Sequence, residues 1–227
     1  STGGIACIYE RDTGGAGNWG LTKAVKASDD AEYEGFGNSV CKDGDLIVVN
    51  AGGSGSMPGS AYVFERNAGV TNNWGEVRKF SPADGSGEKY FGGSVSVKGD
   101  VVLLSAFNEK GGNAYDQVVH AFGRNVGGTD NLGPAWETSL SAEYGRFTNF
   151  GGRVVAAGDF MAAGVPDHQV GANGRQGAAF VFQIPRPDWQ QKARLTASDG
   201  MENACFGRSV AVDGDVVIVS ANGQGFG

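Results

Sequence analysis

Four acidic residues recur at one position of the sequence and could bind a metal ion. Each stands seven residues before a phenylalanine, and they are Asp29, Asp84, Glu143 and Asp199. The first has further carboxylates close by, at Asp30, Glu32 and Glu34. Clustered carboxylates suit hard cations such as calcium. An aspartate in strings such as "SDD", "ADG" and "SDG" can equally cap a turn through its own backbone. Because the acids keep a fixed spacing, we expect turn caps, with an ion site as the alternative.

No other pattern in the sequence is typical of catalysis. The two histidines, His120 and His168, stand in different contexts, with no cysteine or histidine at ligand spacing. The string "GAGNWG" at residues 15–20 matches GxGxxG, but a further strand is expected where a phosphate-binding helix must begin. No GxSxG motif presents a nucleophile. The sequence therefore predicts no catalytic residue, and a protein that is not an enzyme.

Composition narrows the possible partners. The net charge is −7, and the sequence has no cluster of basic residues that could bind a phosphate backbone, so nucleic acid is not expected as a partner. No apolar run approaches the roughly 20 residues of a membrane-spanning helix. The three cysteines, Cys7, Cys41 and Cys205, are too few for a disulfide framework and are expected to be buried free thiols.

The chain contains four copies of one repeat. A Phe-Gly pair begins at Phe36, Phe91, Phe150 and Phe206, with spacings of 55, 59 and 56 residues. Eight residues after each phenylalanine comes a Gly-Asp pair, and three of the four pairs precede the similar runs "LIVVNA", "VVLLSA" and "VVIVSA". A register that holds over four copies indicates one repeated supersecondary unit.

Each repeat is predicted to contain four β-strands. The Phe-Gly strand ends at the Gly-Asp pair, which is a two-residue hairpin signal. The apolar run that follows is typical of a strand covered on both faces. An aromatic strand such as "SAYVFER" and a tryptophan-led strand such as "WGEVRKFSP" alternate apolar and polar residues. No helical period persists, so the whole chain is predicted to be all-β.

The third repeat departs most from this pattern. Trp19, Trp74 and Trp189 stand 17 residues before the next Phe-Gly pair, whereas Trp136 stands three residues late, behind the insertion-like "VGGTDNLGP". Long polar segments also distinguish this repeat, at 108–117, 125–134 and 166–176. Loops on a rigid scaffold commonly carry function, so these segments and the rim around them are the predicted contact surface. No individual ligand-binding residue is predicted.

The two ends of the chain carry complementary half-repeats. The string "GIACIYER" at residues 4–11 resembles "GSAYVFER" at 59–66, so residues 1–27 supply the last two strands of a repeat. Residues 206–221 supply the first two strands. We predict one domain over residues 1–227, a β-propeller of four four-stranded blades whose closing blade is shared between the N- and C-terminal strands. Pairing within the chain is expected, and strand exchange with a neighbouring copy is the alternative.

These motifs resemble the FG-GAP repeat family, best known from the propeller heads of integrin α subunits. The resemblance covers nearly the whole chain and implies a propeller on a secreted or cell-surface protein, used for adhesion and ligand binding. Many members bind calcium in the first hairpin, but here it has contracted to strings such as "KDGD" and "VKGD", too short to supply six to eight oxygens. No cofactor is expected, and calcium stays the alternative. Integrin-like propellers usually have seven blades, so this chain is either a four-bladed ring or a part of a longer array.

The predicted function is a non-catalytic extracellular interaction or adhesion module that binds a protein or a glycan through its blade loops. One alternative is a structural subunit of an extracellular assembly or fibre. Another is a glycan-binding lectin, because some fungal lectins with similar repeats bind sugars between blades.

Overall fold

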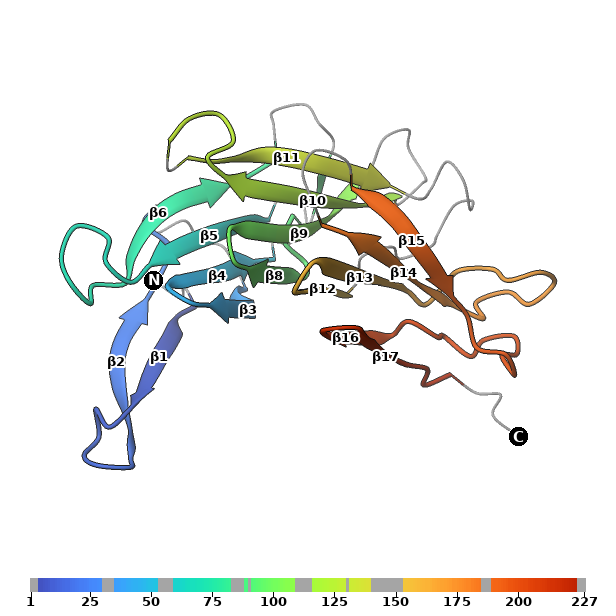
Figure 1. The fold of residues 1–227 in the computed structure, drawn as a ribbon, viewed down its shortest axis with the longest axis horizontal. Helices are drawn as coiled ribbons and strands as arrows, with labels where there is room; N and C mark the ends of the chain where they lie inside the picture. Colours follow the sequence, from blue (N-terminus) through green and yellow to red (C-terminus); the bar gives the residue numbers. More distant parts are fainter. Residues whose placement is uncertain are drawn as a thin grey trace.

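The computed structural model consists of antiparallel β-strands, and no helix occurs in the residues that it describes. The strands form small sheets that follow one another along an open arch (Figure 1). The prediction of an all-β chain is confirmed. The structure describes residues 4–29, 35–52, 59–82, 88–89, 91–108, 116–129, 131–139, 153–184 and 189–223.

Two sheets have the four-stranded order expected of a repeat. In the first, β3 (Phe36–Asp43), β4 (Leu46–Ala51), β5 (Ser60–Glu65) and β6 (Gly75–Phe80) are hydrogen-bonded in sequence order. The other sheet has the same order and contains β12 (Arg153–Ala157), β13 (Phe160–Val165), β14 (Ala178–Gln183) and β15 (Gln190–Leu195). In both, the strand that opens the repeat lies on the concave side of the arch (Figure 1).

The middle sheet has the same plan with an interrupted first strand. It contains β7 (Glu88–Lys89), β8 (Val95–Lys98), β9 (Val101–Asn108), β10 (Asp116–Arg124) and β11 (Leu132–Ser139). Both β7 and β8 pair with β9, at its end and its beginning respectively. They therefore occupy one edge of the sheet in succession.

The remaining strands form two separate half-sheets at opposite ends of the arch (Figure 1). The N-terminal half-sheet is β1 (Ala6–Arg11) with β2 (Trp19–Val25), and the C-terminal half-sheet is β16 (Ser209–Asp213) with β17 (Val216–Ser220). The expected pairing of the two within the chain is not formed, and the ring is open in this structure. Each half-sheet is instead held by the complete sheet beside it in the arch, β1 against β3 and β16 against β12 and β13.

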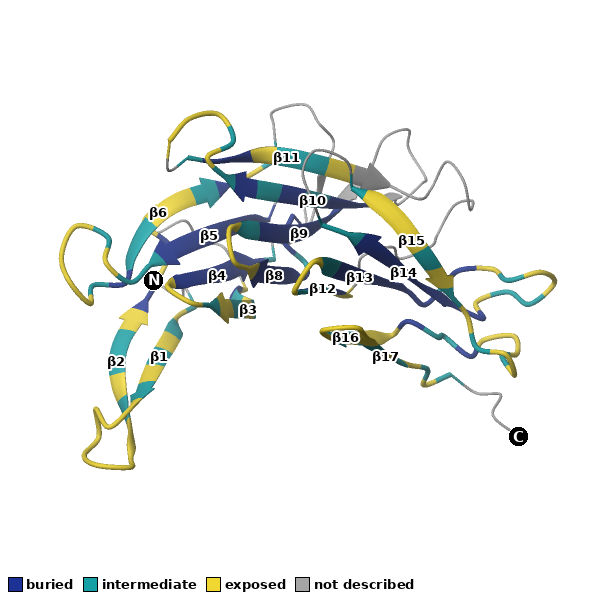
Figure 2. Ribbon diagram, in the orientation of Figure 1, coloured by how far each residue is buried: buried dark blue, intermediate teal, exposed yellow. Residues whose placement is uncertain are grey.

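The core lies between successive sheets. Every residue of β4 is buried, as its unbroken apolar run predicts (Figure 2). Leu46 and Val48 pack toward the middle sheet, while Ile47 and Val49 pack toward the N-terminal half-sheet. The equivalent strand β17 alternates between exposed and half-buried residues, because only one of its faces meets a neighbour. The sequence-based expectation that this strand is covered on both faces is therefore wrong for β17.

The glycine of the Phe-Gly pair has a conformational role. Gly92 and Gly207 have φ angles of 81° and 97°, in a region that favours glycine. A Cβ atom on Gly207 would lie 2.2 Å from the carbonyl oxygen of Ala178, which leaves no room for a side chain. The glycine of the Gly-Asp hairpin is also left-handed, with φ between 52° and 54° in all four copies, as the tight hairpin requires.

Candidate interaction surface

Strand direction divides the loops between two rims of the arch. The hairpin rim carries the Gly-Asp turns and, in the part of the chain that the structure describes, loops that join the third and fourth strands of a repeat, such as 12–18 and 67–73 and the loop that follows Arg124. The opposite rim, called the crossover rim here, carries the connection 166–176 and the segment 196–206 that leads into the last repeat. The three polar segments of the third repeat are therefore not brought together. Segment 125–134 lies on the hairpin rim, while 166–176 and the flanking ends of 108–117 lie on the crossover rim.

The prediction of an insertion before Trp136 in the third repeat is wrong. Leu132 pairs with Arg124, just as Trp19 pairs with Arg11, so the intervening loop has the same length in both repeats. The loop 125–131 also has the same stabilising hydrogen bond as the loop 67–73, since Asn131 Nδ2 donates to the Val126 carbonyl at 3.1 Å and Asn73 Nδ2 donates to the Ala68 carbonyl at 3.1 Å. Leucine has replaced tryptophan at this position.

Trp136 therefore occupies a later position of β11 than the tryptophans of the other repeats. Its ring stacks on Trp189 of the next repeat, with centroids 4.8 Å apart and planes 11° apart. This stack packs the middle sheet against the next repeat.

Ion pairs connect neighbouring sheets along the hairpin rim. Arg66 binds Glu10 of the N-terminal half-sheet and donates from Nε to Asp45 of its own sheet at 2.9 Å. The hydrogen bond to Glu10 is the main cause that raises the pKa of Arg66. Arg124 repeats this arrangement one sheet further along, with Glu65 of the preceding sheet and with Asp100 of its own sheet at 3.2 Å.

A cavity of about 410 Å³ opens on the hairpin rim between the first complete sheet and the middle sheet. Its lining includes Val77, Arg78 and Asn131 together with the Arg124–Glu65 pair. The charged groups of this pair already neutralise one another, so the cavity offers less positive charge than its two arginines suggest.

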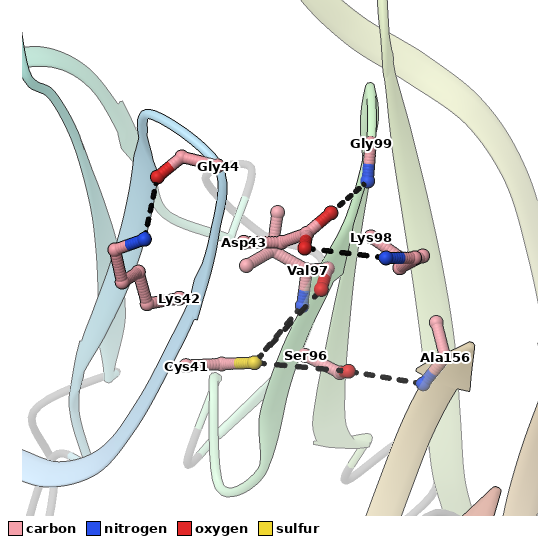
Figure 3. Close-up of polar contacts among 9 residues, drawn as sticks. All are labelled: Cys41, Lys42, Asp43, Gly44, Ser96, Val97, Lys98, Gly99 and Ala156. Carbon is pink, nitrogen blue, oxygen red and sulfur yellow. Dashed lines mark hydrogen bonds and ion pairs between the residues drawn. The ribbon is translucent and has the colours of Figure 1, made fainter. Parts of the chain in front are cut away.

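Short polar side chains join the concave-side strands of successive sheets (Figure 3). The Val97 N–H donates to Cys41 Sγ at 3.4 Å, and the Ala156 N–H donates to Ser96 Oγ at 3.0 Å. Two further bonds follow the same rule, from the Val95 N–H to Ser39 Oγ at 3.4 Å and from the Val154 N–H to Ser94 Oγ at 3.2 Å. We call Ser39, Cys41, Ser94 and Ser96 the side-chain ladder. It satisfies edge N–H groups that would otherwise lie buried without an acceptor.

The side-chain ladder was missed by reasoning from the sequence. Its signal is the serine three residues after the Phe-Gly phenylalanine in three of the four repeats, at Ser39, Ser94 and Ser209. An ionic contact extends the ladder, since Asp43 accepts a bond from the Gly99 N–H at 2.7 Å and pairs with Lys98 at 3.2 Å (Figure 3). The Gly99 hydrogen bond is the main cause that lowers the pKa of Asp43.

Comparison with known protein families matches the FG-GAP repeat at residues 19–64, 74–125 and 189–227. These stretches make up more than half of the chain. The chain belongs to the FG-GAP repeat family. The resemblance expected from the sequence is thus confirmed, and the matched stretches include the Phe-Gly pairs at Phe36, Phe91 and Phe206. No curated protein matches the chain.

FG-GAP repeats are typical of extracellular adhesion and integrin-like domains. In the part of the chain that the structure describes, no helix has the length and apolar character needed to cross a membrane.

The connection 166–176 of this FG-GAP chain is closed and anchored by hydrogen bonds. Val170 and Asn173 exchange two backbone hydrogen bonds of 3.1 Å around a two-residue turn whose tip is Gly171 and Ala172. Gln176 is buried and donates to the Ala197 carbonyl at 3.2 Å, and Asn173 donates to the Gly200 carbonyl at 3.2 Å. The loop is therefore fastened to the segment that enters the last repeat, and its tip remains exposed.

Of the four periodic acids, Asp29 and Asp199 lie among the described residues. Asp29 accepts bonds from the Tyr62 hydroxyl at 3.1 Å and from Lys79 Nζ at 2.6 Å. Partial burial is the largest single influence and raises its pKa, but the bonds and charge of Lys79 outweigh it, so the pKa of Asp29 is lowered overall. Asp29 therefore links two repeats. The other acids of this set, Asp84, Glu143, Asp30, Glu32 and Glu34, lie outside the described residues.

The described residues contain no group of three or more His, Cys, Asp or Glu side chains that could hold a metal ion. The histidines lie in different parts of the fold, His120 on a strand and His168 in the connection 166–176. His120 lies on β10 with Nδ1 3.5 Å from Glu137, while His168 is buried with its ring 5.8 Å from the ring of Phe180. Burial is the main cause that lowers the pKa of His168, with the charge of Arg194 acting in the same direction.

Cys7 is exposed, and Cys41 and Cys205 are partly buried. All three are free thiols. The expectation of buried thiols is thus wrong for Cys7.

Proposed function

We propose that this FG-GAP chain is a non-catalytic extracellular interaction module, and that its sheets are blades of a β-propeller. The observation that supports this most is the fastened loop 166–176, whose exposed tip is presented by a stack of packed sheets. A loop that is already ordered loses little conformational entropy when it binds a partner. The proposed contact surface is the crossover rim around this loop.

The proposed partner is a protein or a carbohydrate at the cell surface or outside the cell. The loop offers a mixed surface, with the amide of Gln169 and the guanidinium of Arg175, which pairs with Asp167 at 2.7 Å. Groups of this kind form directional hydrogen bonds with backbone carbonyls, carboxylates or sugar hydroxyls. We propose that binding requires no cofactor, and a calcium-dependent variant of this function is tested by chelation below.

A structural subunit of an extracellular assembly is the second candidate. It is favoured by the two half-sheets, because each leaves an apolar face exposed at one end of the arch. A lectin is the more specific form of the first candidate and is separated from protein binding by the choice of probe.

The test uses the whole chain on a glycan array and on an array of extracellular protein domains. Ala172→Arg places a bulky charge at the exposed tip of the loop on the crossover rim. Thr129→Arg is the matched control, because Thr129 is also an exposed loop residue of the third repeat but lies on the hairpin rim. We expect Ala172→Arg to abolish a binding signal that Thr129→Arg retains. Equal binding by both variants would reject the crossover rim, and an absence of binding on both arrays would contradict the interaction module itself.

A further inference from the structure

The two half-sheets are each bare on the side where a complete blade is covered. Val216 and Ile218 of β17 are 61% and 67% exposed, whereas their repeat equivalents Leu46 and Val48 are buried in β4. In β2, Trp19 is 69% exposed, whereas its equivalent Trp74 is 1% exposed. Among the described residues, the N-terminal half-sheet therefore consists of strands equivalent to the last two of a blade, and the C-terminal half-sheet of strands equivalent to the first two.

The register in which they would combine follows from the complete sheets. In each of these, the residue after the Gly-Asp pair lies opposite the residue that follows the phenylalanine of the aromatic strand, as in Leu46 with Glu65, Val101 with Gly123 and Phe160 with Gln183. In β1 the equivalent residue is Glu10, which follows Tyr9. The same irregularity in the pairing of the third strand with the fourth confirms which residues of β1 and β5 are equivalent. It falls between Val63 and Phe64 in the first complete sheet and between Ile8 and Tyr9 in the N-terminal half-sheet.

By this rule, β17 and β1 would pair as antiparallel neighbours, with Val216 opposite Glu10, Ile218 opposite Ile8 and Val219 opposite Cys7. The faces agree with this register. Ile8 already packs on the first complete sheet, so Ile218 beside it would gain the same neighbour. Tyr9 and Cys7 are exposed in β1, and they would join the half-buried Val217 and Val219 on the other face. A slip by one residue would reverse every side chain and lose this match.

The charges at the strand ends agree as well. In two complete sheets an arginine two residues after the phenylalanine of the aromatic strand pairs with the aspartate of its own Gly-Asp turn, Arg66 with Asp45 and Arg124 with Asp100. The equivalent arginine of the N-terminal half-sheet is Arg11, and the equivalent aspartate of the C-terminal half-sheet is Asp215. Both are exposed at present, so the two half-sheets carry opposite charges where pairing would bring them together.

We propose that the edge of β17 is an interaction surface for β1 of a second copy of this chain, and that the two half-sheets complete one four-stranded blade across the contact. Within one chain, β1 and β17 lie at opposite ends of the arch, and the packed cores between sheets fix that arrangement (Figure 1). A second copy reaches the open edge without any change in the arch. The contact is head-to-tail, because each copy offers a different half-sheet at each end. This proposal rests on the assignment of the sheets as FG-GAP blades and does not involve the crossover rim.

Disulfide trapping tests the register in the whole chain, because Cys7 is a natural exposed thiol. Val219→Cys places a second thiol directly opposite it, at a cross-strand separation that a disulfide can span. After mild oxidation we expect covalent dimers and larger species on a non-reducing gel, with a mass-spectrometric link between Cys7 and position 219. The control Ile218→Cys points to the other face and should link weakly, and adding Cys7→Ser to Val219→Cys should abolish the link. The same link confined to monomers would show closure within the chain and overturn the proposal, as would equal linking by Ile218→Cys.

Charge reversal provides an independent measurement that needs no new thiol. Arg11→Glu and Asp215→Lys each place like charges at the head-to-tail contact, so each variant alone should self-associate several-fold more weakly in light scattering than the wild-type chain of 23.4 kDa. An equimolar mixture restores opposite charges at every contact and should recover association. A mixture that stays as weak as the separate variants, or a wild-type chain that is monomeric at all concentrations, would overturn the proposal. Either failure would leave array binding by the crossover rim unaffected, so the two proposals fail separately.

Discussion

Replacing Ser96 with alanine should destabilise the fold far more than its small change in volume suggests. The Ser96 hydroxyl accepts a hydrogen bond from the Ala156 N–H at 3.0 Å, and both residues are buried between two sheets. The alanine variant removes the acceptor and leaves a buried N–H without one, which costs about 1–3 kcal/mol. For a chain of this size, each kcal/mol lowers the melting temperature by about 2–4 °C, so the expected fall is about 2–12 °C.

Thermal unfolding followed by circular dichroism measures this effect, with two comparison variants. Ser96→Cys should recover part of the loss, because Cys41 already accepts an N–H bond at the same position of the first repeat. Ser209 is the repeat equivalent of Ser94 and lies exposed in the C-terminal half-sheet. Ser209→Ala should therefore change the melting temperature by less than about 2 °C. If Ser96→Ala melts with Ser209→Ala and the wild-type chain, the side-chain ladder does not stabilise the contact between sheets.

Three further outcomes are expected from the same melting assay. Val48→Ala should cost about 2–3 kcal/mol, because Val48 is fully buried, whereas Ile218→Ala at the equivalent exposed position should cost under about 1 kcal/mol at concentrations where the chain is monomeric. EDTA should leave the melting temperature unchanged. A fall in the melting temperature of more than a few degrees would instead indicate that the periodic acids bind a metal ion. The folded state lowers the pKa of Asp43, so its contribution to stability is present at neutral pH and is lost as the pH falls below the ordinary value of 3.8. Asp43→Asn should therefore flatten the loss of stability as the pH falls below 3.8, and an unchanged slope there would contradict this role.

Much of the repeat could be predicted from local sequence, because the forces that shape it act over a few residues. The Gly-Asp pairs predicted tight hairpins, since only glycine adopts their positive φ angle at little cost. The unbroken apolar run at Leu46–Ala51 predicted a strand covered on both faces, and it is buried throughout. The contact surface was predicted less well. Its three segments divide between two rims, because strand direction and not sequence proximity decides which end of a sheet a loop occupies.

The insertion predicted in the third repeat was wrong for a related reason. The position of Trp136 suggested an insertion, yet Leu132 fills the tryptophan position and the loop keeps its length. A tryptophan alone does not mark strand register, because register is set by the hairpin loop and the backbone ladder, which tolerate leucine in its place.

The sequence by itself determined the repeat, its four strands and the complementary character of the two half-repeats, because turn chemistry and apolar patterning are local. Only the tertiary structure decided that Arg66 and Arg124 each bridge two sheets, and that the serines of the ladder serve the edge N–H groups of the next sheet. Only it decided, too, that β1 and β17 stand apart. Whether the first and last strands of the chain meet depends on the angle between successive sheets. That angle arises from many contacts in three cores, so no short stretch of sequence determines it.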